Sequence, residues 1–311
     1  MKKDFKTSIG GQALIEGVMM RGPEKSAMAV RIPDGIIDVE SWPTKKPNAW
    51  YKKTPFVRGI FNMGDSLIMG YRCLMKSMEK SGMGDEEEPT KFEIWLSEKL
   101  GKSIYNVVAV MALVLGMGIG VGLFIFLPTF IAGGIGYFTG GMEGGIWRSL
   151  VEGVIKIAIF LAYLSLVGRM KDIRRVFEYH GAEHKTIACY ERGLPLTLEN
   201  VRGQGRFHPR CGTSFLLIVL VSSILVFSVI YVEHVLLRSL LKIAMLPIVI
   251  GIAYEFIKFT GRHVNPFTRA LSAPGLWFQR LTTVEPDDSQ IEVAIEAMLP
   301  AIPEVEGADE W

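Results

Sequence analysis

The chain has 311 residues, of which 49% are hydrophobic, and its mean hydropathy is +0.29. Its formal net charge of +2 creates no strong overall field that would favour nucleic acid as a partner. Its three cysteines form no regular framework, which argues against a disulfide-stapled secreted domain.

Residues 1–103 are expected to form a small mixed α/β region in the cytoplasm or at the membrane surface. The first residues contain no apolar run after their lysines, so we expect no cleavable signal peptide. Two short strands are predicted around the turn signal Pro33-Asp34-Gly35. Residues 57–80 have the periodicity of an amphipathic helix that suits a membrane interface.

The stretch GGQALIEGVMMRGP, from Gly10 to Pro23, is unusually rich in glycine, which lets the backbone approach a ligand closely. No Gly-Lys-Ser/Thr follows, so it is not a phosphate loop. Two interpretations stay open. The stretch is either a loop that packs Glu16 and Arg21 over a site elsewhere in the chain, or a turn-rich entry to a small sheet.

Four apolar segments of about 20 residues predict a polytopic α-helical membrane protein with four transmembrane helices. These segments are residues 104–127, 146–167, 213–232 and 240–257. The second segment carries Arg148, Glu152 and Lys156 at four-residue spacing, and we expect these side chains to pair on one helical face and extend outward at the membrane surface.

The distribution of basic residues predicts the topology. Lysine and arginine are frequent before the first span, at the start of the link 168–212 and after the fourth span, whereas the other two links hold only Arg238. Both termini and the link 168–212 are therefore expected in the cytoplasm. The C-terminal segment 258–311 ends in an acidic tail, with nine acidic and no basic residues from Val284 onward, and its last residues are expected to be loose.

The link 168–212 contains the residues that suggest chemistry. In YHGAEHKTIACYERG, residues 179–193, His180 and His184 share one face of a predicted helix, and His180-x-x-Glu183-His184 is the inverted form of a zinc-hydrolase motif. RFHPRCGTS adds His208 and Cys211 at a spacing typical of metal ligands. We therefore predict a divalent metal held by these histidines and this cysteine, with Glu183 as general base. Zinc is favoured because a thiol joins imidazoles, although this donor set also suits iron.

The role of the metal stays open at this point. If His180, His184, His208 and Cys211 all bind it, the shell is closed and the metal is structural; if one is absent, water can take the open position and react. Such a short motif also arises by chance in helices, in which case these are unrelated interfacial residues. Glu255 and His263 are further candidates for a ligand or a substrate contact. The alternatives are that Glu255 pairs with Lys258 and that His263 is solvated.

Five motifs in order carry a resemblance that extends from about Gly10 to Ile295. They are GGQALIEGVMMRGP, YHGAEHKTI, RFHPRCGTSF, GRHVNP and GLWFQRLTTVEPDDSQIEVAI. Together they resemble the YqhQ-like family of bacterial membrane proteins, a domain of unknown function whose members are described as predicted metal-dependent enzymes. The resemblance implies a site near His180, Glu183, His184, His208 and Cys211. It implies no substrate.

The function favoured by these observations is a zinc-dependent hydrolase in the bacterial cytoplasmic (inner) membrane. A site at the cytoplasmic face suggests a lipid-linked or membrane-peptide substrate, with the lipid bilayer and no nucleic acid as partner. The alternative is a membrane scaffold or regulator whose metal only fixes the link 168–212 and whose acidic tail recruits a partner. A transporter is disfavoured, because no span has a mid-membrane charge clearly suited to a substrate path.

Overall fold

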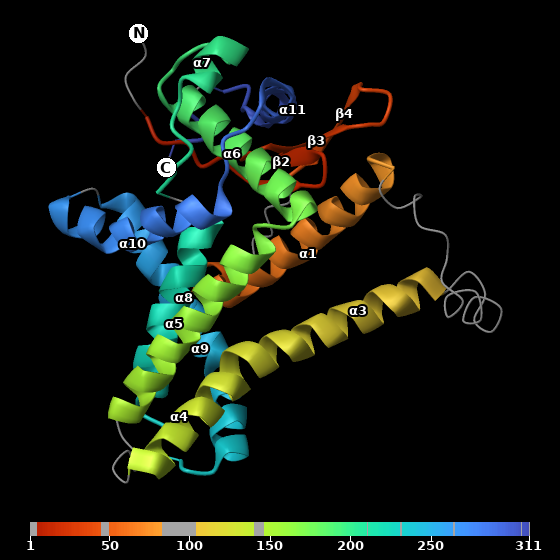
Figure 1. Ribbon diagram of the computed structural model, residues 1–311. Coiled ribbons are helices and arrows are strands. Elements are labelled where there is room, and N and C mark those ends of the chain that lie inside the picture. Colours follow the sequence, from red (N-terminus) through yellow and green to blue (C-terminus); the bar gives the residue numbers. More distant parts are fainter. Residues whose placement is uncertain are drawn as a thin grey trace. The chain divides into compact units, whose positions relative to one another are not determined.

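A four-stranded antiparallel sheet forms the N-terminal part of the chain, in a computed structural model that describes residues 5–44, 50–82, 104–139, 146–209, 211–230, 232–263, 265–305 and 307–310 (Figure 1). The chain divides into two units. Unit 1 consists of Met1–Gly84, Leu164–Val219 and Ile250–Trp311, and unit 2 of Asp85–Tyr163 and Leu220–Val249.

The sheet of unit 1 has the order β1-β2-β3-β4, with strands β1 (Gly10–Leu14), β2 (Gly17–Arg21), β3 (Lys25–Arg31) and β4 (Ile37–Pro43). The predicted turn at residues 33–35 connects β3 to β4, and Gly35 adopts the positive φ of 80° that favours glycine. The glycine-rich stretch supplies β1, β2 and the tight turn between them, in which Glu16 has a φ of 50°. This stretch is therefore a turn-rich entry to the sheet.

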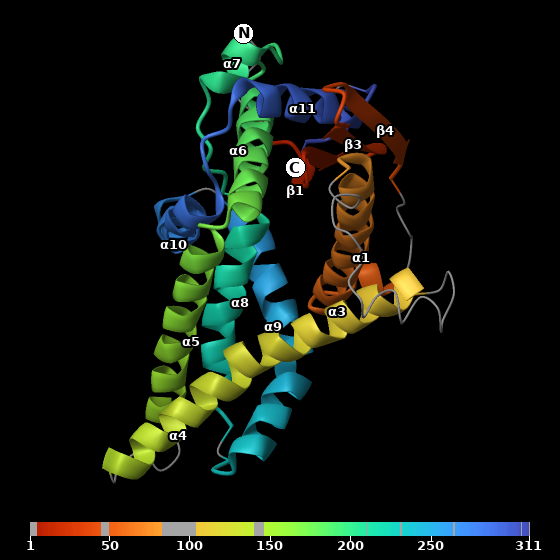
Figure 2. The ribbon, with the colours of Figure 1, turned by 45° about the vertical axis from the view of Figure 1, so that its right-hand side comes forward.

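The two faces of the sheet are covered by different helices because side chains alternate along each strand. On one face Leu14 and Met28 pack with Cys73 of α1 (Val57–Lys80). On the other face Val18 and Ala29 join the core that includes α6 (Lys171–Glu191) and α11 (Asp288–Met298). Figure 2 shows α11 and α1 on opposite sides of the strands. This arrangement places α6 beside the edge strand β1.

The remaining helices of unit 1 surround α6 and the start of α1. They are η1 (Trp50–Lys52), α7 (Leu198–Arg202), α10 (Pro266–Thr282), η4 (Leu299–Ala301) and parts of α8 (Gly212–Phe227) and α9 (Val235–Arg262). The start of α1 lies against α9, where a Cβ atom on Gly59 would come within 2.6 Å of the Tyr254 Cβ.

The acidic tail is part of the folded core, contrary to the expectation that its last residues are loose. Ile291 and Met298 of α11 are fully buried against the sheet. Thr7 pairs with Glu310 in a β-bridge, and its hydroxyl donates a 2.5 Å hydrogen bond to Asp309. These contacts fix the tail because they satisfy backbone and carboxylate groups at the edge of the sheet.

Within the part that the structure describes, unit 2 consists of helices and the short connections between them. It contains α3 (Ile104–Val121), a π-helical segment η3 (Gly122–Phe126), α4 (Leu127–Thr139), most of α5 (Ile146–Val167) and the other parts of α8 and α9. Within the described residues, three helices are long and apolar enough to span a membrane: Val114–Phe138, Ile146–Val167 and Val235–Gly261. The second has the predicted bounds. The predicted span 213–232 corresponds to α8, which is apolar but ends after 16 residues.

The charged residues of α5 lie inside unit 2, and the expectation that they extend outward is wrong. Glu152 accepts a 2.9 Å hydrogen bond from Arg238 and binds Lys242, and both cations come from α9. Arg148 Nε lies 3.6 Å from the same carboxylate. Lys156 does not share this carboxylate and donates to the Ser223 hydroxyl at 3.0 Å. These side chains are at most 7% exposed because neighbouring helices supply their partners.

We predict that Glu152→Gln destabilises the protein by about 3–5 kcal/mol, because it leaves buried cations without their shared carboxylate. The exposed Glu233 of unit 2 provides a matched control, and Glu233→Gln should change little. The free energy of unfolding in mixed micelles checks both variants. Equal stability of the two would contradict a buried ionic network around Glu152.

Candidate metal centre

Three of the predicted ligands come together in unit 1. His180 and His184 lie one turn apart on α6, with ring centroids 4.4 Å apart. Cys211 immediately precedes α8, and the ligand atoms of all three residues lie within 4.8 Å of one another. Tetrahedral zinc, with bonds of 2.0–2.3 Å, would hold such atoms about 3.3–3.7 Å apart. A small contraction therefore brings these donors to a zinc-binding geometry.

Both imidazoles are oriented by backbone carbonyl groups. His180 Nδ1 lies 2.8 Å from Thr282 O, and His184 Nδ1 lies 2.6 Å from Arg206 O. Because a carbonyl oxygen only accepts, each Nδ1 must carry the donated hydrogen. The Nε2 atoms then face the donor cluster, and His180 Nε2 lies 3.2 Å from Cys211 Sγ. Histidines that bind metals are typically held in this way, with the second ring nitrogen bonded to a carbonyl or carboxylate.

Gly181 explains how the Thr282 carbonyl reaches His180. A Cβ atom at this position would overlap Val284 O, so only glycine lets residues 282–286 cross α6 so closely. The crossing is fixed by a 2.9 Å hydrogen bond from Val284 N to Phe177 O. Glycine in a helix is less favourable than alanine by about 1 kcal/mol. Here that cost permits the contact that orients a candidate ligand.

The cluster favours a charged thiolate at Cys211. Burial alone would raise the pKa of this thiol, but the charge of His184 and the hydrogen bond from His180 lower the pKa well below its usual range. Thr213 adds a backbone N–H at 3.4 Å from Sγ. Burial disfavours a charge on His180, yet the bond to Cys211 and the nearby Glu183 outweigh it and raise the pKa of His180 to about 9. Without a metal, the geometry therefore supports a thiolate–imidazolium pair.

Glu183 lies next to these donors and is only 5% exposed. Its Oε2 is 3.9 Å from His180 Nε2, and burial raises the pKa of this carboxyl group. A Cβ atom on Gly11 of β1 would lie 2.7 Å from Glu183 Cγ, so this glycine makes room for the carboxylate. Among the described residues, none forms a hydrogen bond with it. A buried carboxyl group of this kind is a candidate acid or base.

His208 is the predicted ligand that lies outside the cluster. Its ring centroid is 5.8 Å from that of His184, and its Nε2 faces Glu191 Oε2 at 3.3 Å. Gln279 of α10 holds the His208 backbone from both sides, accepting from its N–H at 2.8 Å and donating to its carbonyl at 2.7 Å. Because these contacts hold His208 outside the cluster, three candidate ligands remain: His180, His184 and Cys211.

The quoted motifs contain Arg206, Gln279 and Thr282, but nothing in the sequence indicated that these residues hold the ligands in place. The Thr282 and Arg206 carbonyls and the Gln279 amide come from distant parts of the chain, and backbone carbonyls have no residue signature. Gly181 is the one residue that could have indicated a close contact at this point of α6, because nothing in the local sequence explains a glycine inside an amphipathic helix.

The four further candidates lie elsewhere. Glu16 binds Arg175 and accepts a 3.1 Å hydrogen bond from Tyr179, so it does pack on α6, before the histidines. Arg21 faces α1, on the other side of the sheet. Glu255 accepts a 2.7 Å hydrogen bond from Arg58 of α1. The exposed His263 lies against Phe259 at the end of α9.

We predict that Gly181→Ala lowers zinc affinity by about 10–100-fold, the usual effect of losing a group that orients a ligand. Competition with a chromogenic chelator measures this affinity. Gly205→Ala is the control because a Cβ atom there meets nothing within 4 Å. Helix propensity alone would make Gly181→Ala stabilising, so unchanged affinity with a gain in stability would contradict the role assigned to Gly181.

We also predict that zinc affinity rises about tenfold per pH unit up to a pH of about 9. Below this pH His180 carries a proton in the metal-free protein, whereas the metal binds neutral imidazole, so each zinc displaces one proton. In Cys211→Ser the thiolate that raises this pKa is absent, and the rise should end near the ordinary histidine value of about 6.5. Titration of zinc from pH 6 to 10 against a competing chelator provides the test, and a flat profile between 7 and 9 would contradict it.

The chain is similar to sequences whose function is also undetermined. Residues 54–304 match the family profile described as Protein of unknown function (DUF1385). The Uncharacterized protein YqhQ of Bacillus subtilis (strain 168) is 37% identical over 305 residues, which cover 95% of this chain and 92% of that protein. No solved structure matches the chain. The resemblance to the YqhQ-like family is thus confirmed, and the chain belongs to the DUF1385 family of proteins of unknown function.

Proposed function

We propose that the protein is a zinc-dependent membrane hydrolase whose metal is held by His180, His184 and Cys211. Three protein ligands leave one position for water or substrate, as catalytic zinc sites do. Two features support this donor set: both imidazoles direct Nε2 toward the thiol, and the Cys211 environment favours the thiolate. The contact of His208 with Glu191 supports an open position rather than a closed four-ligand shell.

The observation that carries the proposal is the position of Glu183. It is a buried carboxyl group, with a raised pKa, directly beside the three donors. When bound, zinc lowers the pKa of a water ligand to about 7 and polarises a substrate carbonyl or phosphoryl oxygen. Glu183 takes the proton from the attacking water and passes it to the leaving group, a transfer that a raised carboxyl pKa suits near neutral pH.

The membrane arrangement is part of the same proposal. α8 is the third of four spans in chain order, with both termini and the metal centre at the cytoplasmic face of a bacterial cytoplasmic membrane. Its 16 residues correspond to about 24 Å of helix, and a bilayer can thin locally around a span of this length. The basic residues of the N-terminal region and of the start of α6 support this orientation. A centre at the membrane surface suits a lipid-linked or membrane-peptide substrate.

X-ray absorption on zinc-loaded protein tests the coordination. We expect one zinc per chain with two nitrogens, one sulfur and one exchangeable oxygen. Cys211→Ala should lose the metal and His208→Ala should keep it. Three nitrogens and one sulfur without water, with zinc loss in His208→Ala, would instead support a scaffold with a structural metal. Absence of stoichiometric metal after reconstitution with Zn²⁺ and Fe²⁺ would overturn both the hydrolase and the scaffold with a structural metal.

The general base is tested by Glu183→Gln. This variant should retain zinc and fold but lose about 10²–10⁴-fold in hydrolysis, the usual contribution of general acid–base catalysis. The measurement compares wild-type and variant proteoliposomes on a panel of lipid ester, lipid phosphoester and membrane-peptide substrates. Glu178→Gln, on the same helix, is the control. Equal rates for the wild type and Glu183→Gln on every hydrolysed substrate would exclude this role.

A further inference from the structure

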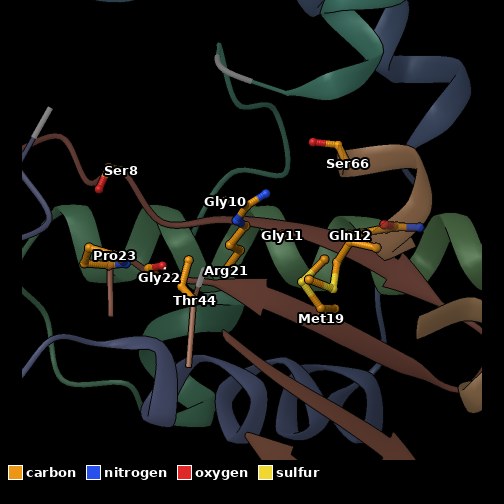
Figure 3. Close-up of a pocket in the computed structure, with 11 residues that line it drawn as sticks. Ser8, Gly10, Gly11, Gln12, Met19, Arg21, Gly22, Pro23, Thr44 and Ser66 are labelled. Carbon is orange, nitrogen blue, oxygen red and sulfur yellow. Dashed lines mark hydrogen bonds between the residues drawn. The ribbon is translucent and has the colours of Figure 1, made fainter. Parts of the chain in front are cut away.

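A groove lies between α1 and strands β1 and β2, on the face of the sheet opposite α6. Its main hollow has a volume of about 420 Å³, within the range of small-molecule sites. Figure 3 shows Met19 and Arg21 of β2 and Ser66 of α1 among the residues that line it. A second hollow of about 190 Å³ shares Arg21 and adds Ile68 and Arg72. We call these two hollows together the α1 groove.

Arg21 lines both hollows from β2, as Thr44 does directly after β4, and the Arg21 side chain belongs to a half-buried residue. No other described residue forms a hydrogen bond or ion pair with it. Lys80 at the end of α1 differs, because it binds both Asp38 and Glu40. A partly buried guanidinium without a carboxylate is a ready site for an anion, because its planar fork matches an oxyanion.

The groove as a whole has a surplus of positive charge. Arg72 is a second cation in its lining, and no partner for it occurs in the described parts of the chain. Among the described residues that line the two hollows, Asp65 is the one carboxylate, and it is already paired with Lys52. Ser66 adds a hydroxyl group on the α1 side. Two cations and a hydroxyl group suit the several oxygens of a phosphate group.

The other part of the lining is apolar and continues onto the surface of α1. Met19 and Met69 line the main hollow, and Ile68 at the rim is 56% exposed. The outer face of α1 displays large apolar side chains at helical spacing: Phe61, Leu67, Ile68, Tyr71 and Met75. The inner face buries small residues: Gly59, Gly70, Cys73 and Ser77. An exposed apolar stripe of this kind marks a surface that contacts a membrane or another apolar partner.

The start of α1 indicates that this partner is the bilayer. A Cβ atom on Gly251 would lie 3.0 Å from Phe56 O, and Tyr254 accepts a 2.8 Å hydrogen bond from Asn62. Both Gly251 and Tyr254 belong to the candidate span Val235–Gly261. The start of α1, from which the apolar stripe extends, thus lies against a helix that is itself apolar enough to lie in lipid.

We propose that the α1 groove binds the phosphate group of an amphiphile that enters from the bilayer. Arg21 and Arg72 contact the phosphate oxygens, and Met19, Met69 and Ile68 contact the adjoining apolar chain. The ligand chemistry is therefore a phosphate monoester in the head group of a lipid. This site needs no metal, and strand β1 separates it from Glu183.

Binding to the full-length protein tests the proposal in a maltoside detergent, which contains no phosphate. Isothermal titration calorimetry compares dihexanoyl phosphatidic acid, dihexanoyl phosphatidylcholine and inorganic phosphate at fixed ionic strength. We expect phosphatidic acid to bind and Arg21→Gln to weaken it by about tenfold or more, the usual loss for a charge-assisted hydrogen bond. Arg202→Gln removes an exposed cation paired with Asp288, and should bind like the wild type.

Each outcome has one meaning. Binding of phosphatidic acid but not of inorganic phosphate supports the proposal, and comparable binding of both overturns the lipid ligand in favour of a soluble phosphate compound. Binding of phosphatidylcholine with the same affinity, or no binding at all, overturns the proposal. If Arg21→Gln fails to fold, Ser66→Trp provides a second test. Its large side chain fills the hollow from an exposed position and leaves Arg21 unchanged, so we expect it to abolish binding. Unchanged affinity in Ser66→Trp overturns the proposal as well.

Discussion

The crossing of residues 282–286 over α6 is the contact on which the candidate metal centre depends. It requires glycine at position 181, and it places the Thr282 carbonyl where His180 can donate to it. The same segment leads from α10, which fixes the His208 backbone through Gln279, to α11, which covers the sheet. One close approach of two backbones therefore connects the orientation of a ligand with the core of unit 1.

The sequence predicts those features of the centre that follow from helix geometry. Residues four apart on a helix share a face, so His180 and His184 could be paired without a structure. The spacing of His208 and Cys211 is typical of metal ligands and predicted that both join the site. The structure places Cys211 beside the two histidines of α6, but it directs His208 to Glu191 instead. This choice depends on the Gln279 side chain, about 70 residues away in the chain, and no local pattern encodes it. β1 and β2 were missed for a related reason, since glycine is depleted in strands and hid their alternation.

The inward direction of the charged face of α5 departs from expectation, and its cause is the solvent around the protein. In water a helix hides its apolar face, but in lipid the apolar residues face outward and polar groups must find partners inside. Periodicity shows that Arg148, Glu152 and Lys156 share a face of α5, but not which way that face points. The structure turns it inward, toward Arg238, Lys242 and Ser223. α1 likewise buries small residues and exposes large apolar ones.

The order of unit 1 along the chain has a consequence for biosynthesis. The strands leave the ribosome first, but the helix that covers one of their faces, α11, leaves it almost 250 residues later. In the interval the apolar helices of unit 2 are made and must enter the membrane. The nascent sheet therefore exposes Val18, Met20 and Ala29 until α11 has been made, and it needs protection by a chaperone or by the nearby bilayer. The segment 282–286, which orients His180, is made after the apolar helices of unit 2, so the His180–His184–Cys211 cluster is completed only after those helices have left the ribosome.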